Sequence, residues 1–144
     1  MKKLIVTLIC FVLLIGVMPT PALAAIGDSA SEPYYNNALR INSKFSIDSD
    51  GVASVYVSYT GRSGVTSSVY ITSKIQKQNS NGSWSDVNNG MTNNLWIDAS
   101  TNVRYSNTHT LTVSRGTYRA VINYTINGSG GVADVQEDII SYTF

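Results

Sequence analysis

The sequence predicts an all-β protein, a single antiparallel β-sandwich of about seven strands that follows a cleavable signal helix. Apolar and polar residues alternate with a period of two along most of the chain after residue 37, as expected for strands with one buried and one solvated face. Turn residues interrupt the alternation about every 10 residues. No segment of helical length after the signal carries apolar residues at positions i, i+3, i+4 and i+7, which argues against helices in the mature domain.

Residues 1–24 have the three parts of a secretion signal. A basic start, Met1-Lys2-Lys3, precedes an apolar run over residues 4–18, and Ala22-Leu23-Ala24 supplies small residues at the spacing of a cleavage site. The run is shorter than the ~20 residues that a membrane-spanning helix needs. We therefore expect an exported mature protein without a membrane span.

The composition argues against most enzyme chemistries and against a basic nucleic-acid site. The only cysteine, Cys10, lies in the signal, so the mature chain has no thiol and no disulfide. Ten Lys and Arg, two of them in the signal, face nine Asp and Glu, which leaves the mature chain nearly neutral. His109 is the only histidine, and the adjacent Glu137 and Asp138 point to opposite faces of a strand. We expect a protein that is not an enzyme and uses no metal or cofactor.

The polar residues 25–37 are expected to form a flexible leader, and the sandwich domain is expected to span residues 38–144. Alternation predicts the first two strands over 39–47 and 53–59. The segment between them, Asp48-Ser49-Asp50-Gly51, is typical of a turn, because Asp favours tight turns and Gly accepts a left-handed backbone.

A third predicted strand, 69–76, is followed by Asn81-Gly82, a strong hairpin signal. Trp84 should lie on the returning strand and face the core. Residues 88–106 alternate poorly, and their pairing is left open.

The last strands are predicted over 108–113, 118–126 and 132–144. His109 shares the phase of the apolar residues on its strand and is expected to face inward as a structural residue. The alternation slips at Ile139-Ile140, which predicts a bulge there.

Gly116-Thr117-Tyr118 leads into a strand and resembles the tyrosine corner of immunoglobulin-like domains, in which Gly-x-Tyr-x-Cys marks the penultimate strand. Ala120 occupies the cysteine position here. The resemblance implies structural roles for Gly116 and Tyr118, with the tyrosine hydroxyl bonded to backbone a few residues upstream. A core tyrosine after an ordinary glycine turn is the alternative.

Several short elements stand in a fixed order along the chain: Phe45-Ser46-Ile47, Gly51-Val52-Ala53, Ile75-Gln76-Lys77, residues 82–87 and Gly116-Thr117-Tyr118-Arg119. Together they resemble small secreted proteins of Gram-positive bacteria, mainly Firmicutes, that carry one uncharacterised immunoglobulin-like β-sandwich domain. The resemblance covers roughly residues 38–144. It implies export into the extracellular space of a Gram-positive cell and a sandwich fold, and it carries over no catalytic or binding residue.

Aromatic residues give the sequence's one indication of a ligand-contact surface. Tyr56 and Tyr70 fall on the polar sides of consecutive strands, and Trp96 and Tyr105 lie in the irregular stretch, so all four are expected outside the core. Their flat rings with polar edges suit stacking on sugars or anchoring a protein partner. We expect Tyr56 and Tyr70 on one sheet face. Ordinary cross-strand pairing of aromatic residues is the alternative.

These observations predict a non-enzymatic β-sandwich module that binds a protein or a polysaccharide at or outside the cell surface. A structural protein that assembles through its sheet edges or coats the envelope is a second interpretation, and a secreted toxin or bacteriocin-like factor is a third. The identity of the partner and the oligomeric state are left open.

The exported protein should begin at Ala25 or within a few residues of it, because Ala22-Leu23-Ala24 is the small-x-small site that follows the apolar run. N-terminal sequencing of protein from the culture medium measures this. An intact Met1 on the exported protein, or a lipid attached to Cys10, would contradict the prediction.

Overall fold

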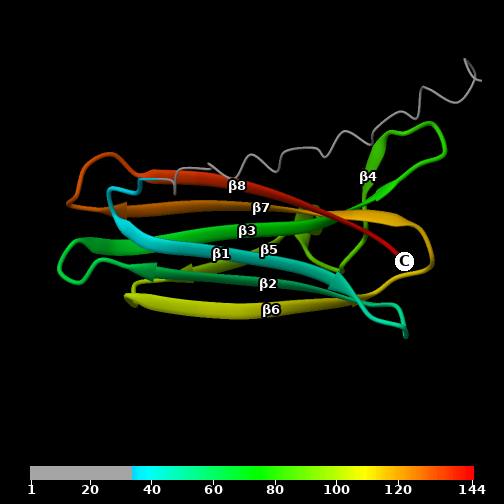
Figure 1. The fold of residues 1–144 in the computed structure, drawn as a ribbon, viewed down its shortest axis with the longest axis horizontal. Helices are drawn as coiled ribbons and strands as arrows, with labels where there is room; N and C mark the ends of the chain where they lie inside the picture. The colour runs from blue at the N-terminus through cyan, green and yellow to red at the C-terminus, as the bar shows by residue number, and fades with distance from the viewer. Residues whose placement is uncertain (1–33) are drawn as a thin grey trace, which may run out of the picture. The chain divides into compact units, whose positions relative to one another are not determined.

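The computed structural model describes residues 34–144, which form two antiparallel β-sheets around one core (Figure 1). The predicted signal and most of the predicted leader lie outside the described residues. The elements, in chain order, are β1 (Ala38–Ile47), β2 (Val52–Gly61), β3 (Thr66–Gln78), β4 (Trp84–Asp86), the 3₁₀ turn η1 (Thr92–Asn94), β5 (Trp96–Ser100), β6 (Arg104–Thr112), β7 (Thr117–Gly128) and β8 (Asp134–Thr143).

The strands divide into a sheet of three, in the order β1-β2-β6, and a sheet of five, in the order β4-β3-β7-β8. The fifth strand, β5, also pairs with β3: it lies along residues 69–73 of β3, while β4 lies along residues 76–78. All pairings are antiparallel. The predicted all-β, antiparallel class is therefore confirmed for residues 34–144.

The core is built by the period-two alternation of the strands. On β2, every second residue from Ala53 to Gly61 is buried, and the residues between them are half-buried on the outer face. The buried side chains of both sheets form one cluster, which includes Phe45, Ile47, Val55, Val57, Tyr59, Val69, Ile71, Ile75, Ile122, Tyr124 and Ile126. Because full burial of an aliphatic or Phe side chain stabilises a fold by about 1.5–3 kcal/mol, this cluster is the main source of stability.

Two hairpins close with the same turn geometry. In the β1–β2 turn, the N–H of Gly51 donates to the carbonyl of Asp48 (3.1 Å), and the N–H of Asp48 donates to that of Val52 (3.2 Å). In the β3–β4 turn, Gly82 donates to Asn79 (2.9 Å) in the same way. Gly51 and Gly82 have φ of +80° and +83°, a left-handed conformation that glycine adopts without steric cost. Both predicted turns are confirmed.

The irregular stretch 88–106 contains β5 and the start of β6, which raises the count to eight strands in the described part of the chain. The inner face of β5 combines buried Trp96 with buried Asp98, whereas the apolar Ile97 is 57% exposed on the outer face. A pattern search for apolar residues on the inner face therefore misses this strand.

The predicted bulge at Ile139-Ile140 is wrong, because the pairing of β7 with β8 runs without a register shift from Ile126↔Asp134 to Thr117↔Thr143. The apolar phase changes in the sequence because the inner face of β8 carries Asp134, Gln136 and Asp138 before the apolar Ile140. Register shifts occur instead near the start of β1, between Ala38 and Arg40, and of β3.

The packed domain begins before residue 38, the predicted boundary. The carboxylate of Asp134 accepts hydrogen bonds from the backbone N–H groups of Asn36 (2.7 Å), Asn37 (2.8 Å) and Ala38 (2.9 Å). The Asn37 side chain is fully buried and donates to the carbonyl of Val132 (2.9 Å). The last residues of the predicted leader are thus anchored beside β8.

Tyr118 is buried near the start of β7, and its hydroxyl donates to the backbone carbonyl of Ser114 (2.8 Å). This is the hydrogen bond that the tyrosine-corner resemblance implies. Gly116, in the same turn, has a φ of +154°, a backbone conformation that residues with a side chain rarely adopt. Trp84, which was expected in the core, is only half-buried and lies on the outer surface, where the guanidinium of Arg119 stacks 4.4 Å from its ring centroid.

Replacing Tyr118 with Phe should lower the free energy of unfolding by about 1–2 kcal/mol, because Ser114 loses a buried hydrogen-bond partner. Tyr142→Phe is the matched control and should cost less, since Tyr142 is 39% exposed near the end of the chain. Urea unfolding of both variants measures the difference. Equal, negligible effects would show that the corner bond contributes nothing to stability.

Candidate functional site

The structure places Tyr56 and Tyr70 on different sheets. Tyr56 lies on β2 in the sheet of three strands, and Tyr70 lies on β3 in the sheet of five. The chain crosses from one sheet to the other between β2 and β3, so the two outward-facing rings lie on opposite sides of the domain. The expectation that they share one face is therefore wrong.

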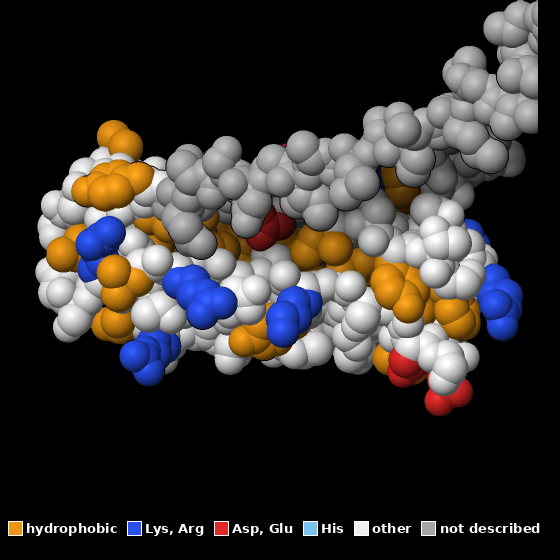
Figure 2. Space-filling model, in the orientation of Figure 1, with side chains coloured by type: hydrophobic (Ala, Val, Ile, Leu, Met, Phe, Trp, Pro, Cys, Tyr) orange, Lys and Arg blue, Asp and Glu red, His pale blue; other side chains and the backbone are white. Residues whose placement is uncertain are grey.

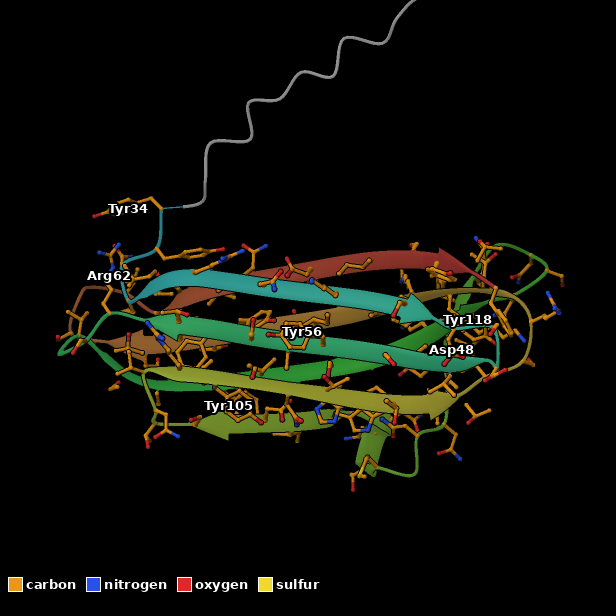
Figure 3. The ribbon with its side chains drawn as sticks, turned by 60° about the horizontal axis from the view of Figure 1, so that its bottom comes forward. Tyr34, Asp48, Tyr56, Arg62, Tyr105 and Tyr118 are labelled. Carbon is orange, nitrogen blue, oxygen red and sulfur yellow. The ribbon has the colours of Figure 1, made fainter. Side chains whose placement is uncertain are left out.

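The other two aromatic candidates lie between the sheets. Trp96, on β5, is only 7% exposed and belongs to the core cluster, which corrects the expectation that it lies outside. Tyr105, on the inner side of β6, is partly buried and packs against the core, and Figure 3 shows it between β6 and β5. Neither ring is free to act as an exposed platform.

A buried carboxylate, Asp98, joins β5 to β6. It accepts hydrogen bonds from the hydroxyl of Tyr105 (2.6 Å), the amide of Asn107 (2.7 Å) and Nε2 of His109 (2.8 Å). The His109 ring stacks on Trp96 with centroids 5.0 Å apart and an interplanar angle of 4°. The inward orientation predicted for His109 is confirmed. Sequence patterns missed Asp98 because an acidic residue in a short strand looks like part of a loop.

The hydrogen bonds of this cluster shift the pKa values of Asp98 and Tyr105. Burial alone would raise the pKa of Asp98, but the hydrogen bonds from Tyr105, His109 and Asn107 outweigh it, and the pKa lies below its usual value. Burial and the neighbouring carboxylate raise the pKa of Tyr105 to about 12. The cluster therefore contains an ionised Asp98 and a neutral Tyr105 at physiological pH.

A pocket of about 530 Å³ lies beside this cluster. It is lined by Met91, Thr92, Leu95, Trp96, Ile97, Thr108, His109 and Thr110. Among the described residues no hydroxyl group is hydrogen-bonded to His109, so the His109–Asp98 pair lacks the nucleophile that a hydrolytic triad would need. The geometry supports a structural role, joining the edges of the two sheets.

The outer face of the three-stranded sheet combines an aromatic ring, hydroxyl groups and positive charge. We call it the Tyr56 face and define it as the outward side chains of residues 40–46, 54–60 and 104–110. Tyr56 lies at its centre on β2, paired with Lys44 of β1 and with Thr108 of β6. Figure 3 shows Tyr56 on the middle strand of this sheet. Ser, Thr and Asn fill most of the other positions.

Three cations stand on the Tyr56 face. Arg40 and Arg104 flank Thr60 from the two neighbouring strands, and Lys44 lies beside Tyr56. All three are exposed, and none forms a side-chain hydrogen bond or an ion pair with another described residue. Figure 2 shows Lys and Arg side chains (blue) along the side of the molecule where β1 lies. A polar pocket of about 290 Å³ opens on this face and is lined by Tyr56, Ser58, Tyr59, Thr60, Arg104, Tyr105 and Ser106.

The outer face of the five-stranded sheet differs, because its cations have partners. Nζ of Lys74 lies 3.1 Å from the carboxylate of Asp86, and Arg119 stacks on Trp84 while donating to the side chain of Gln76 (2.8 Å). Of the four predicted contact residues, Tyr56 and Tyr105 line the pocket on the face with unpaired charge, and of these two only Tyr56 points outward from the sheet.

Comparison of the chain with protein-family models, with curated proteins and with solved structures finds no match in any of the three. Within residues 34–144, no helix has the length and apolar character to cross a bilayer. The same residues contain no group of three or more His, Cys, Asp or Glu side chains placed to hold a metal ion. What the domain can do must be inferred from its own surface.

Asp98→Asn should lower the free energy of unfolding at pH 7 by about 1.5–3 kcal/mol, because the amide cannot replace an ionised acceptor of three hydrogen bonds. A carboxylate with a lowered folded pKa stabilises the fold above its unfolded pKa of about 4, and this contribution is lost as the pH falls through the folded value. The variant should therefore lose less stability than the wild type between pH 5 and pH 2.

Urea unfolding across this pH range measures the difference, with Asp50→Asn at an exposed turn as the control. A pH dependence of Asp98→Asn that is parallel to that of the wild type would contradict the role assigned to this carboxylate.

Proposed function

We propose that this chain is an exported, non-enzymatic binding domain of immunoglobulin-like architecture, which holds a polysaccharide at or outside the cell surface through the Tyr56 face. The observation that carries the proposal is a single aromatic ring, that of Tyr56, which lines a polar pocket and has Ser and Thr hydroxyl groups around it on the sheet surface. Export rests on the signal-like residues 1–24.

The strand order supports the immunoglobulin-like part of the proposal. In such sandwiches strands A, B, E and D form one sheet, and strands C, F and G the other. The order β1-β2-β6 corresponds to A-B-E, with no strand in the place of D among the described residues, and β3-β7-β8 corresponds to C-F-G. Strands β4 and β5 both add to the edge of β3. The Tyr118 hydroxyl bond falls at the start of β7, the place of strand F, where the tyrosine corner belongs.

The shape of the Tyr56 face favours an extended ligand. Because neighbouring strands lie about 4.8 Å apart, three strands present a surface wide enough for a polymer chain to lie across them. Tyrosine has only two side-chain torsions, so it gains contact area with a sugar ring at little entropic cost. Serine and threonine hydroxyls both donate and accept hydrogen bonds, which suits the hydroxyl groups of sugars.

Two of the sheet edges, β1 and β8, carry features that disfavour self-assembly. A bulge interrupts the start of β1, and the inner face of β8 carries the carboxylates of Asp134 and Asp138. Bulges and inward-pointing charges are devices that prevent the edge-to-edge pairing of sheets.

Tyr56→Ser should reduce retention of the exported protein on intact bacteria or insoluble polysaccharide at least tenfold, a loss of about 1.4 kcal/mol. Tyr70→Ser removes an equivalent ring from the opposite sheet and should leave retention near the wild-type value. Both variants should lose about 1 kcal/mol or less of stability, the energy of cross-strand pairs. A pull-down with quantified bound fractions measures the effect. Loss of retention with Tyr70→Ser but not with Tyr56→Ser would move the binding surface to the five-stranded sheet.

A further inference from the structure

We propose that the ligand of the Tyr56 face is an acidic polysaccharide, a glycan whose sugar rings carry carboxylate or sulfate groups. This inference rests on the binding function proposed above and adds the charge of the ligand to it. Its basis is the unequal distribution of acidic residues between the two sheets. The overall composition does not show this distribution, because the chain as a whole is nearly neutral.

All acidic residues of the strands belong to the five-stranded sheet. Strands β1, β2 and β6 contain no Asp or Glu, whereas β4, β5 and β8 contain Asp86, Asp98, Asp134, Glu137 and Asp138. The cations of the three-stranded sheet, Arg40, Lys44 and Arg104, all point outward. A chain that is nearly neutral overall therefore presents one face with positive charge only.

These cations are not needed to hold the fold. Arg62, at the same end of the sheet, shows what a structural cation looks like: its guanidinium donates to the carbonyls of Ala38 (3.2 Å) and Tyr35 (3.1 Å). Arg40, Lys44 and Arg104 make no such bonds with the described residues. Their guanidinium and ammonium donors remain available to an external anion.

The spacing of the cations suits a polymer with repeated charge. Arg40 and Arg104 are separated by the width of two strand gaps, about 10 Å at the backbone, and Lys44 lies four residues from Arg40, about 13 Å along β1. Long side chains can adjust these separations by several ångströms. A chain of linked sugars with an anionic group on alternate rings can therefore contact all three.

Tyr56 favours a glycan over an acyclic polyphosphate chain. Its ring lies next to Lys44 in the same row of the sheet, and the pocket beside it contains Arg104. An anionic sugar can place its ring on the tyrosine and its acidic group on a cation. A linear polyphosphate has acidic groups but no ring, so it would not depend on Tyr56.

The test uses the exported full-length chain and columns of heparin, polygalacturonate, dextran and linear polyphosphate. The Arg40→Gln/Lys44→Gln/Arg104→Gln variant should bind heparin and polygalacturonate at least tenfold more weakly than the wild type. The control, Lys74→Gln/Lys77→Gln/Arg115→Gln, removes the same charge from outside the Tyr56 face and should bind within threefold of the wild type. Equal melting temperatures establish that the variants are folded. If the triple variant is unstable, Arg104→Gln alone replaces it and is expected to bind severalfold more weakly than the wild type.

Binding of the wild type to both acidic glycans, weakened by salt, by the triple variant and by Tyr56→Ser, supports the inference. Equal loss in the triple variant and its control would overturn it, because charge outside the Tyr56 face would then matter as much. Retention on dextran equal to that on heparin, or retention on polyphosphate that does not need Tyr56, would also overturn it. Retention on bacteria without retention on any acidic glycan would overturn this inference alone, whereas no retention on cells or polymers would overturn the proposed function as well.

Discussion

The structure depends on hydrogen-bonded carboxylates, Asp98 and Asp134 buried and Asp138 half-buried, that close the two open sides of the paired sheets. On one side Asp134 holds three successive backbone N–H groups at the start of β1, and Asp138 accepts from the Ser43 hydroxyl (2.6 Å). On the other side Asp98 ties β5 to β6 through Tyr105 and two further side chains. Without a disulfide to link the sheets, these charge-assisted hydrogen bonds fix the edges at which the core would otherwise meet water.

The placement of the carboxylates also determines the charge of the outer surface. Asp98, Asp134 and Asp138 are committed to bonds within the domain, and Asp48 accepts from two N–H groups of its own turn. The acidic residues that compensate the charge of the chain are thus buried or located at loops and on the five-stranded sheet. The cations of the three-stranded sheet have no acidic neighbour on their own face. The same distribution of acidic residues therefore stabilises the sheet edges and leaves the outer face of the three-stranded sheet positively charged.

The alternation of apolar and polar residues predicted most of the strands, because a strand with one buried face has an apolar residue at every second position. The β1–β2 and β3–β4 turns were equally predictable, since each requires a glycine in a left-handed conformation. The pattern failed where polar residues face inward. In β5 and β8, Asp98 and Asp134 take positions that apolar residues occupy in other strands, so the first strand was missed and the second was assigned a bulge that it lacks.

The sequence by itself determined the all-β class, the turn positions, the absence of cysteine from residues 34–144 and the outward orientation of Tyr56. Each of these follows from local rules, namely residue type and side-chain alternation along one strand. Only the tertiary structure decided which strands share a sheet. That assignment separated Tyr56 from Tyr70, placed Trp96 in the core and brought Arg40 and Arg104 to either side of Thr60. Strand partners are chosen by contacts between segments far apart in the chain, and no local pattern records that choice.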